Sequence, residues 1–250
     1  MRNEDVTRTL GLEGGEYYIT APAPCPYLEG EVERKVFAYL GGPQAPTLNS
    51  MLSRRGFRRS QNIIYRPACD ACHACTPVRI IVNEFDLDRA RRRIMRKNAD
   101  LARTVRPPKA TSEQFSILRG YLDRRHPDGG MAEMTVLDFA SMVEETAVDT
   151  AILEYRRRDD KGAGGLVAAA LSDRLADGLS MVYSFFEPDE EQRSLGAYMI
   201  LDHIALARDL GLPYVYLGYW VDGSPKMDYK RSYQPLERLT PNGWTRMSPD

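Results

Sequence analysis

The sequence predicts an α+β protein built from two domains. Residues 107–250 carry two helix signals, then three strand signals in a row, and then another helix and a short strand. Residues 1–106 form a smaller part that contains all four cysteines together with strand and helix signals of its own. Two prolines at positions 107 and 108 end a basic segment and mark the expected boundary between the domains.

The N-terminal part is expected to mix strands with a short helix. Residues 16–20 and 78–82 are rich in β-branched and aromatic side chains, which favours strands. Residues 47–52 have helical character, and Gly56 follows as a suitable C-terminal cap. The segment 89–109 holds nine Lys and Arg residues against one acidic residue, and we expect its first part to be a basic helix.

The C-terminal part begins with two helix candidates. Thr111 and Thr135 are typical N-caps, since Gln114 and Asp138 follow three residues later. The later signals are strands at 151–155, 165–172 and 179–186, a helix at 195–210 and a strand at 213–218. Three meandering strands, a helix and a further strand form the core order of the GNAT acyltransferase fold. We therefore expect a GNAT-like C-terminal domain, which by itself does not give the function.

The bulk composition is that of an ordinary globular protein. The chain has 43% hydrophobic residues and a formal net charge of −1, so it is no generic binder of polyanions. No secretory signal or apolar run of transmembrane length is visible, and we expect a cytoplasmic protein that does not enter membranes. In a reducing compartment closely spaced cysteines indicate metal or redox chemistry more than disulfides.

The cysteines have the spacing of a metal site. Three of them stand at two-residue intervals, and the fourth is distant: Cys69, Cys72, Cys75 and Cys25. Four thiolates suit zinc or an iron–sulfur cluster equally well, and His73 is an alternative ligand. The alternative is that some of these cysteines are small buried residues without a metal.

Arginines precede the cysteines. Thirteen residues without an acid contain five of them: Arg54, Arg55, Arg58, Arg59 and Arg66. With the segment 89–109 they could form a phosphate-binding surface, because Arg binds phosphate through two parallel hydrogen bonds. Tyr65 could add a stacking face for a base. The alternative is a solvated charged surface.

Two segments of the C-terminal part bear on acyl transfer. Arg193 to Gly196 matches the start of the loop that binds pyrophosphate in GNAT acetyltransferases, but Tyr198 takes a small-residue position. We expect its bulk to obstruct a pyrophosphate and to disfavour coenzyme A. After the last strand, Asp222 could accept a proton, and Lys226 or Lys230 could hold a phosphate or carboxylate. Simple turns and polar loops are the alternatives for both segments.

These residues together resemble the aminoacyl-tRNA–protein transferases, a family that includes leucyl- and arginyl-tRNA–protein transferases. The matching stretches run in order along nearly the whole chain, at 25–28, 56–61, 65–79, 177–183, 194–196 and 212–229. The resemblance implies transfer of an aminoacyl group, leucine in preference to arginine, from aminoacyl-tRNA to proteins with N-terminal Asp or Glu. Such a product is a destabilising N-terminus in the N-degron pathway.

The chemistry of such a transfer suggests a site. We expect Asp222 and Tyr229 to be catalytic residues, and the resemblance implies the four cysteines as ligands of an iron–sulfur cluster or zinc, while the transfer itself needs no cofactor. The expected tRNA- and substrate-binding residues are Tyr27, Arg58, Arg59, Ser60, Tyr65, Arg66 and Lys226. A monomer is expected. Two rival interpretations are a non-catalytic cysteine-rich RNA-binding protein and a coenzyme A-dependent acetyltransferase.

Overall fold

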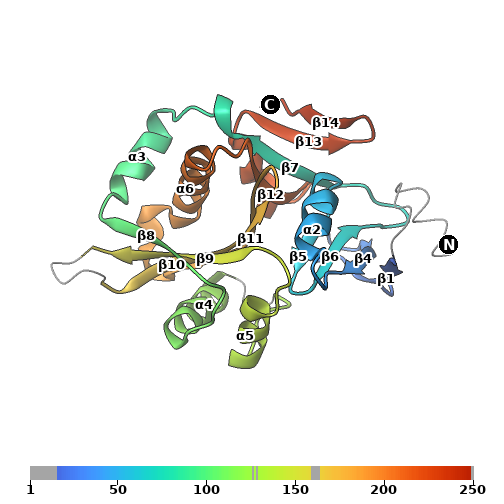
Figure 1. The fold of residues 1–250 in the computed structure, drawn as a ribbon, viewed down its shortest axis with the longest axis horizontal. Coiled ribbons are helices and arrows are strands. Elements are labelled where there is room, and N and C mark those ends of the chain that lie inside the picture. Colours follow the sequence, from blue (N-terminus) through green and yellow to red (C-terminus); the bar gives the residue numbers. More distant parts are fainter. Residues whose placement is uncertain (1–15, 126, 128, 159–163, 249–250) are drawn as a thin grey trace.

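The computed structural model describes residues 16–125, 127, 129–158 and 164–248, and its main element is an eight-stranded sheet (Figure 1). The strands run in the order β14-β13-β7-β12-β11-β10-β9-β8. Their bounds are β7 Cys75–Ile81, β8 Leu101–Arg106, β9 Thr150–Arg157, β10 Leu166–Leu175, β11 Gly178–Phe186, β12 Tyr214–Val221, β13 Leu236–Thr240 and β14 Gly243–Arg246.

The centre of this sheet has the predicted GNAT-like order. Strands β9, β10 and β11 form an antiparallel meander, α6 (Leu195–Asp209) follows, and β12 then returns parallel to β11. The three predicted strands, the helix and the last strand are therefore confirmed. The 3₁₀ turn η2 (Pro188–Arg193) leads from β11 into α6.

Helices cover both faces of the sheet (Figure 1). One face carries α6 and α3 (Arg89–Lys97), and the other carries α4 (Ser112–Arg125) and α5 (Val136–Glu144). Successive side chains of β10 point to opposite faces of the sheet, so this strand contributes to the hydrophobic cores on both faces. Ala170 belongs to the cluster with α6, and Leu171 belongs to the cluster with α4 and α5. The basic helix expected at the start of 89–109 is confirmed as α3, with the Asp88 side chain as its N-cap.

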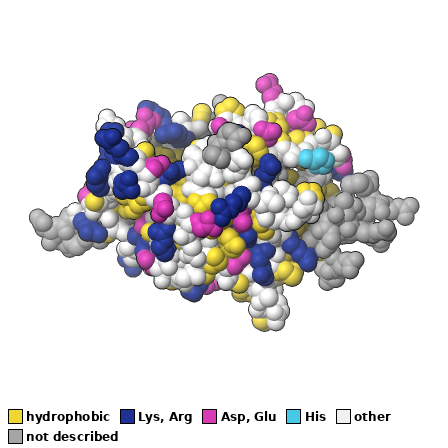
Figure 2. All heavy atoms as spheres, turned by 90° about the horizontal axis from the view of Figure 1, so that it is seen from above, with side chains coloured by type: hydrophobic (Ala, Val, Ile, Leu, Met, Phe, Trp, Pro, Cys, Tyr) yellow, Lys and Arg dark blue, Asp and Glu magenta, His cyan; other side chains and the backbone are white. Residues whose placement is uncertain are grey.

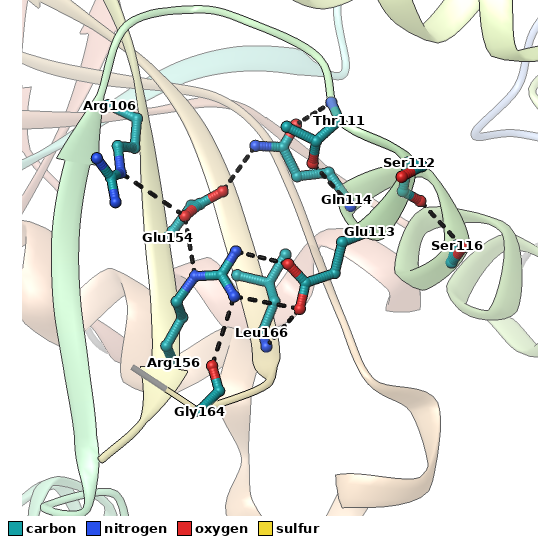
Figure 3. A network of polar contacts seen from close by, with 10 residues as sticks. All are labelled: Arg106, Thr111, Ser112, Glu113, Gln114, Ser116, Glu154, Arg156, Gly164 and Leu166. Carbon is teal, nitrogen blue, oxygen red and sulfur yellow. Dashed lines mark hydrogen bonds and ion pairs between the residues drawn. The ribbon is translucent and has the colours of Figure 1, made fainter. Parts of the chain in front are cut away.

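A polar network fixes the start of α4 to the sheet (Figure 3). Thr111 and Gln114 exchange the two hydrogen bonds of the predicted capping arrangement. Gln114 also donates from Nε2 to Glu154 Oε1 on β9 at 2.9 Å. Arg156, two residues along β9, makes two bonds to the Glu113 carboxylate, at 3.1 and 2.6 Å. The helix therefore has a fixed place on the sheet.

The N-terminal part has a smaller sheet in the order β1-β4-β6-β5 and a two-stranded sheet of β2 and β3. The bounds are β1 Tyr18–Ile19, β2 Ala23–Pro24, β3 Val32–Glu33, β4 Lys35–Tyr39, β5 Arg58–Ser60 and β6 Ile63–Pro67. Helix α2 (Ala45–Arg54) packs on the four-stranded sheet. Gly56 follows it at φ +84°, which confirms the predicted glycine cap.

The large sheet draws on both parts of the sequence. Strands β7 and β8 precede residue 107, yet both pair within the eight-stranded sheet. The second part of the basic segment is thus the edge strand β8. The expected domain boundary at 106/107 falls at the end of that strand, and it stays a prediction. The short elements η1 (Val82–Glu84), α7 (Pro225–Asp228) and η3 (Tyr229–Ser232) complete the described chain. No helix among the described residues is long and apolar enough to cross a membrane.

Candidate functional site

The site is organised around a gap in the large sheet. Strands β11 and β12 pair over only three residues each and then separate. Arg58, the first residue of β5, extends its side chain into this gap. Its guanidinium donates to the carbonyl oxygens of Met181 at 3.2 Å, Leu217 at 3.4 Å and Val182. A cation of the N-terminal part therefore replaces the missing hydrogen bonds between two strands of the GNAT-like core.

Gly218 makes room for this arginine. It sits on β12 at φ +73°, next to an irregularity in the pairing of β12 with β7. A Cβ atom at this position would lie 1.7 Å from Arg58 Nη1. Position 218 therefore requires glycine, both for its backbone conformation and for the space that the guanidinium fills.

A second buried cation lies near the gap. Lys230 on η3 is 4% exposed, and its Nζ donates to the carbonyl oxygen of Tyr219 at 2.5 Å. Burial lowers the pKa of Lys230 to about 7, and the nearby charge of Arg58 lowers it further. Among the described residues, no carboxylate forms an ion pair with either cation. The gap is thus a positively charged place that an anionic substrate group can neutralise.

A cavity of about 1210 Å³ opens between the N-terminal part and the edge of the large sheet. Three of the predicted tRNA-binding residues line it, namely Tyr27, Tyr65 and Arg66, and Tyr219 of β12 lines it too. Tyr65 is the cross-strand partner of Arg58, so the cavity lies directly beside the gap. The Tyr219 hydroxyl donates to the Tyr65 carbonyl oxygen at 3.1 Å and to that of Gly56 at 2.9 Å, which ties the two parts of the chain together.

Burial changes the chemistry of the groups on this wall. It raises the pKa of Tyr27 to about 12, with a smaller contribution from Tyr65, while the charge of Arg58 acts in the opposite direction. Burial also lowers the pKa of Arg66, whose Nη1 donates to the Arg55 carbonyl oxygen at 3.2 Å. At neutral pH the wall therefore presents a neutral phenol of Tyr27 and a charged guanidinium of Arg66.

All four cysteines line the same cavity, and all are half-buried free thiols. Burial raises the pKa of Cys75 to about 12, and the other three thiols add to the effect. The donor set is chemically suited to a soft metal. Among the described residues, however, no three His, Cys, Asp or Glu side chains stand close enough to hold one ion. The ligands predicted from the sequence are gathered in one place but do not have ligating geometry.

The predicted catalytic residues lie next to the cysteine segment. Asp222 follows β12 and is exposed, and its backbone N–H donates to the Ala74 carbonyl oxygen at 3.1 Å. Tyr229 is 51% exposed, and its ring centroid lies 5.9 Å from Lys230 Nζ, which places its phenol near the gap. Partial burial raises the pKa of Tyr229, and the charge of Arg58 opposes the shift. Lys226 is exposed on α7, whereas Lys230 is buried. The two lysines therefore differ in exposure, which could not be seen from the sequence.

Two of the predicted binding residues lie elsewhere. Arg59 is 3% exposed, and its guanidinium binds both oxygens of Asp173 at 2.6 and 2.7 Å. This geometry favours a structural role for Arg59 over the predicted contact with a substrate, because Asp173 already neutralises its guanidinium. Ser60 is exposed at the other end of the β5–β6 hairpin from Tyr65, outside the cavity.

The structure also bears on the expectation that the bulk of Tyr198 disfavours the binding of coenzyme A. Tyr198 is 6% exposed and packs its ring edge-on against Tyr155 in the core, at 5.6 Å between centroids. Its bulk is therefore buried in the core and is not displayed on the surface at the start of α6. Arg193, the first residue of the GNAT-like loop pattern, is held by Asp100 and Glu190. The loop keeps the shape of a strand-to-helix turn, and its arginine is already paired.

Comparison with known proteins identifies the class. Two family models match the chain, the arginine-tRNA-protein transferase N terminus over residues 23–93 and the arginine-tRNA-protein transferase C terminus over 113–240. The chain therefore belongs to this family of tRNA-dependent transferases, and it is an aminoacyltransferase with a GNAT-like domain.

Named relatives narrow the resemblance. The chain is 62% identical to the aspartate/glutamate leucyltransferase of Rhodopseudomonas palustris (strain BisA53), over 93% of this chain and 92% of that protein. It is also 62% identical to the enzyme of the same name from Afipia carboxidovorans, over 93% of each chain. The crystal structure of FemX resembles it distantly, with 10% identity and a TM-score of 0.46 over 87% of this chain and 83% of that one.

Proposed function

We propose that the protein transfers a leucyl group from Leu-tRNA to the α-amino group of a protein whose first residue is Asp or Glu. The observation that carries this proposal is the positively charged gap between β11 and β12, where Arg58 and Lys230 have no described carboxylate partner. The name of the relatives at 62% identity supports leucine and an acidic acceptor. The description of the family models keeps arginine as the second candidate for the transferred group.

The reaction requires no covalent nucleophile. The aminoacyl ester is already activated, so the neutral α-amine attacks its carbonyl carbon, a C–N bond forms and the C–O bond to the terminal ribose breaks. One proton leaves the attacking amine, and one is taken up by the departing ribose oxygen, which becomes a hydroxyl. Correct placement of the two substrates can lower the barrier by about 7–11 kcal/mol. The protein therefore acts mainly by binding and orienting both substrates.

The geometry suggests roles for the site residues. Arg58 would hold the acceptor's side-chain carboxylate at the mouth of the gap, and the charge of Lys230 would add to the positive potential there. In the adjoining cavity, Tyr27 and Tyr65 would stack on the tRNA end and Arg66 would bind a phosphate. Asp222 would accept the proton of the acceptor amine. The Tyr229 phenol is neutral at pH 7, as an ordinary phenol is, so it could donate a hydrogen bond to the leaving oxygen.

The cysteines would serve as a structural or sensing site. Cys25, Cys69, Cys72 and Cys75 would hold an iron–sulfur cluster or zinc once their segments approach each other by a small movement. Such a centre would fix the cavity wall beside Tyr27. Metal analysis of anaerobically purified protein is the direct test, and a preparation with neither iron nor zinc would remove this part of the proposal.

The cellular setting follows from the substrates. Aminoacyl-tRNA is a cytoplasmic molecule, so the protein would act in the cytoplasm. There it would mark acidic N-termini for degradation through an N-degron pathway. We further propose that it acts as a monomer. Light scattering coupled to size-exclusion chromatography would check the monomer. A stable dimer at micromolar concentration would contradict it.

A peptide transfer assay tests the activity. Labelled Leu-tRNA and Arg-tRNA are each incubated with peptides that begin with Asp, Glu, Asn or Gln. We expect leucine on the acidic peptides, preferred over the amides by roughly 10- to 100-fold, the value of one charge-assisted hydrogen-bonded contact. Binding of tRNA without any transfer would favour the rival RNA-binding protein. Nanomolar affinity for coenzyme A would favour the rival acetyltransferase.

A further inference from the structure

Helix α3 carries a group of cations without partners. Among the described residues, the side chains of four of its basic residues are exposed and form no hydrogen bond or ion pair: Arg89, Arg93, Arg96 and Lys97. Of the three nearest acids in sequence, Asp86 is exposed and the other two are already engaged. Asp88 binds Arg91 and caps the helix, and Asp100 binds Arg193. The positive charge of these four residues, called the α3 cluster below, therefore faces solvent.

This cluster differs from the rest of the surface. Some exposed arginines elsewhere meet a carboxylate, as Arg157 does with Glu190 and Arg246 with Glu84, and the unpaired ones are scattered in the sequence, whereas α3 carries four unpaired cations within nine residues. The whole chain has a formal net charge of −1, so the positive charge is local. Figure 2 shows dark-blue side chains gathered over the end of the molecule that carries α3. A local excess of cations on a nearly neutral protein attracts a polyanion to that place.

The α3 cluster lines a groove as well as a helix surface. A hollow of about 810 Å³ lies between α3 and the loop before α6, and its lining includes the whole cluster, Gln192 and Ser194. Ser194 is the N-cap residue of α6, at φ 53°, and its side chain does not cap the helix. The positive end of a helix dipole therefore begins at the edge of the groove and adds to the four cations.

The groove is held in a fixed shape. Asn98 is fully buried at the end of α3, and its Nδ2 donates to the Ile94 carbonyl oxygen at 2.9 Å and to that of Arg193 at 3.0 Å. Arg193 in turn binds Asp100 at 2.8 Å. These contacts join α3 to the loop before α6, so the backbone that carries the cations is already in place when they meet a ligand.

We propose that the α3 groove binds the sugar–phosphate backbone of the tRNA outside its aminoacylated end. The cluster extends over nine residues of helix, about 12 Å, which is long enough to meet several consecutive phosphates. Figure 1 shows α3 at the opposite end of the molecule from β4 and β6, which contribute residues to the cysteine cavity, so only a large ligand can reach both places. This inference rests on the proposed function, because tRNA is the large polyanion that the transfer reaction requires.

The test uses the full chain and two triple variants that each remove three positive charges. The first replaces Arg89, Arg93 and Arg96 by Gln. The matched control replaces Lys109, Arg124 and Arg174 by Gln, three exposed basic residues away from the groove. Binding of uncharged tRNA is measured by fluorescence anisotropy over a range of salt concentrations, and thermal melting checks that both variants fold.

We expect the α3 variant to bind tRNA about tenfold or more weakly at low salt and to lose about two to three units of the slope of log affinity against log salt. The control should keep most of the affinity. In the transfer assay the α3 variant should show a raised KM for Leu-tRNA, while KM for a short leucylated acceptor-end mimic and kcat stay unchanged. A structural role alone would change the kinetics of both donors.

Other outcomes overturn the proposal. Equal tRNA affinity and salt slope in the α3 variant and the control would exclude the groove as a tRNA site. Loss of coenzyme A or pyrophosphate binding in the α3 variant, with tRNA binding intact, would make it a nucleotide site. Because tRNA binding is measured without transfer, a protein that binds tRNA through α3 but transfers nothing would contradict the proposed function and leave this inference standing.

Discussion

Arg59 and Asp173 form a bidentate ion pair that is buried at the contact between β5 and β10. Both side chains are 1% exposed, and Thr150 donates a further hydrogen bond to Asp173 at 2.8 Å. The pair joins the smaller sheet to the GNAT-like core. Arg58 precedes Arg59 on β5, and its side chain lies in the gap between β11 and β12. The ion pair therefore also helps to fix the position of Arg58 in the gap.

Replacing Arg59 should therefore unfold the protein more than it changes the kinetics. Arg59→Ala leaves Asp173 buried without a partner, which costs about 3–5 kcal/mol. Denaturant unfolding of purified protein would measure the loss. The double variant Arg59→Met with Asp173→Leu should recover much of it, since an apolar pair leaves no uncompensated charge. A stable Arg59→Ala protein with weakened tRNA binding would instead show that this arginine binds substrate.

Gly218→Ala should abolish most of the activity. The new Cβ would lie 1.7 Å from Arg58 Nη1, and the backbone at φ +73° costs an alanine about 1–2 kcal/mol more than a glycine. The guanidinium must then leave the gap, and we expect kcat/KM for acidic peptides to fall at least tenfold. Gly42→Ala is the matched control, because its backbone has a similar φ of +68° and no atom lies within 4 Å of its Cβ position. Equal activity of the two variants would contradict the assignment of Arg58 to the site.

Stability should depend on pH through Lys230. Its pKa is about 7 in the folded protein and near 10.5 when unfolded, so the unfolded chain binds more protons between these values. The free energy of unfolding should therefore rise as the pH rises above 7, by up to about 1.4 kcal/mol per pH unit from this group. Below pH 7 the amine is protonated in both states, and the full cost of burying its charge is present.

Lys230→Met isolates this contribution. The difference in unfolding free energy between the wild type and the variant should change from pH 6.5 to pH 9, in favour of the wild type as the pH rises. Urea titrations at several pH values would measure it, and Lys226→Met, at an exposed lysine on α7, is the control. A difference that does not vary with pH would mean that Lys230 keeps its charge throughout.

Cys75 should be slow to react in metal-free protein. Its raised pKa leaves little thiolate at pH 8, and the thiolate is the reactive form. Timed alkylation with iodoacetamide, followed by peptide mass spectrometry, should show Cys75 modified well below the rate of a free cysteine. The same pKa predicts that metal binding strengthens as the pH rises, because the thiol must lose its proton. Rapid alkylation of Cys75 at pH 8 would contradict both expectations.

Periodic segments of this chain could be predicted from the sequence, and charged or short ones could not. The strands β9 to β11 and the helix α6 have apolar patterns that local rules detect, and the Thr111 and Thr135 caps are local as well. The strand β8 was missed because it is an edge strand that carries arginines, as exposed edges often carry charge. The hairpins β5–β6 and β13–β14 depend on pairing with distant strands.

The sequence by itself determined the family, the GNAT-like order of the core and the place where cysteines and arginines gather, since these depend on local pattern and spacing. Only the tertiary structure decided what each arginine does. Arg58 and Arg59 are adjacent and chemically equal, but successive side chains of a strand point to opposite faces. One therefore lies in the gap between β11 and β12, and the other is buried against Asp173.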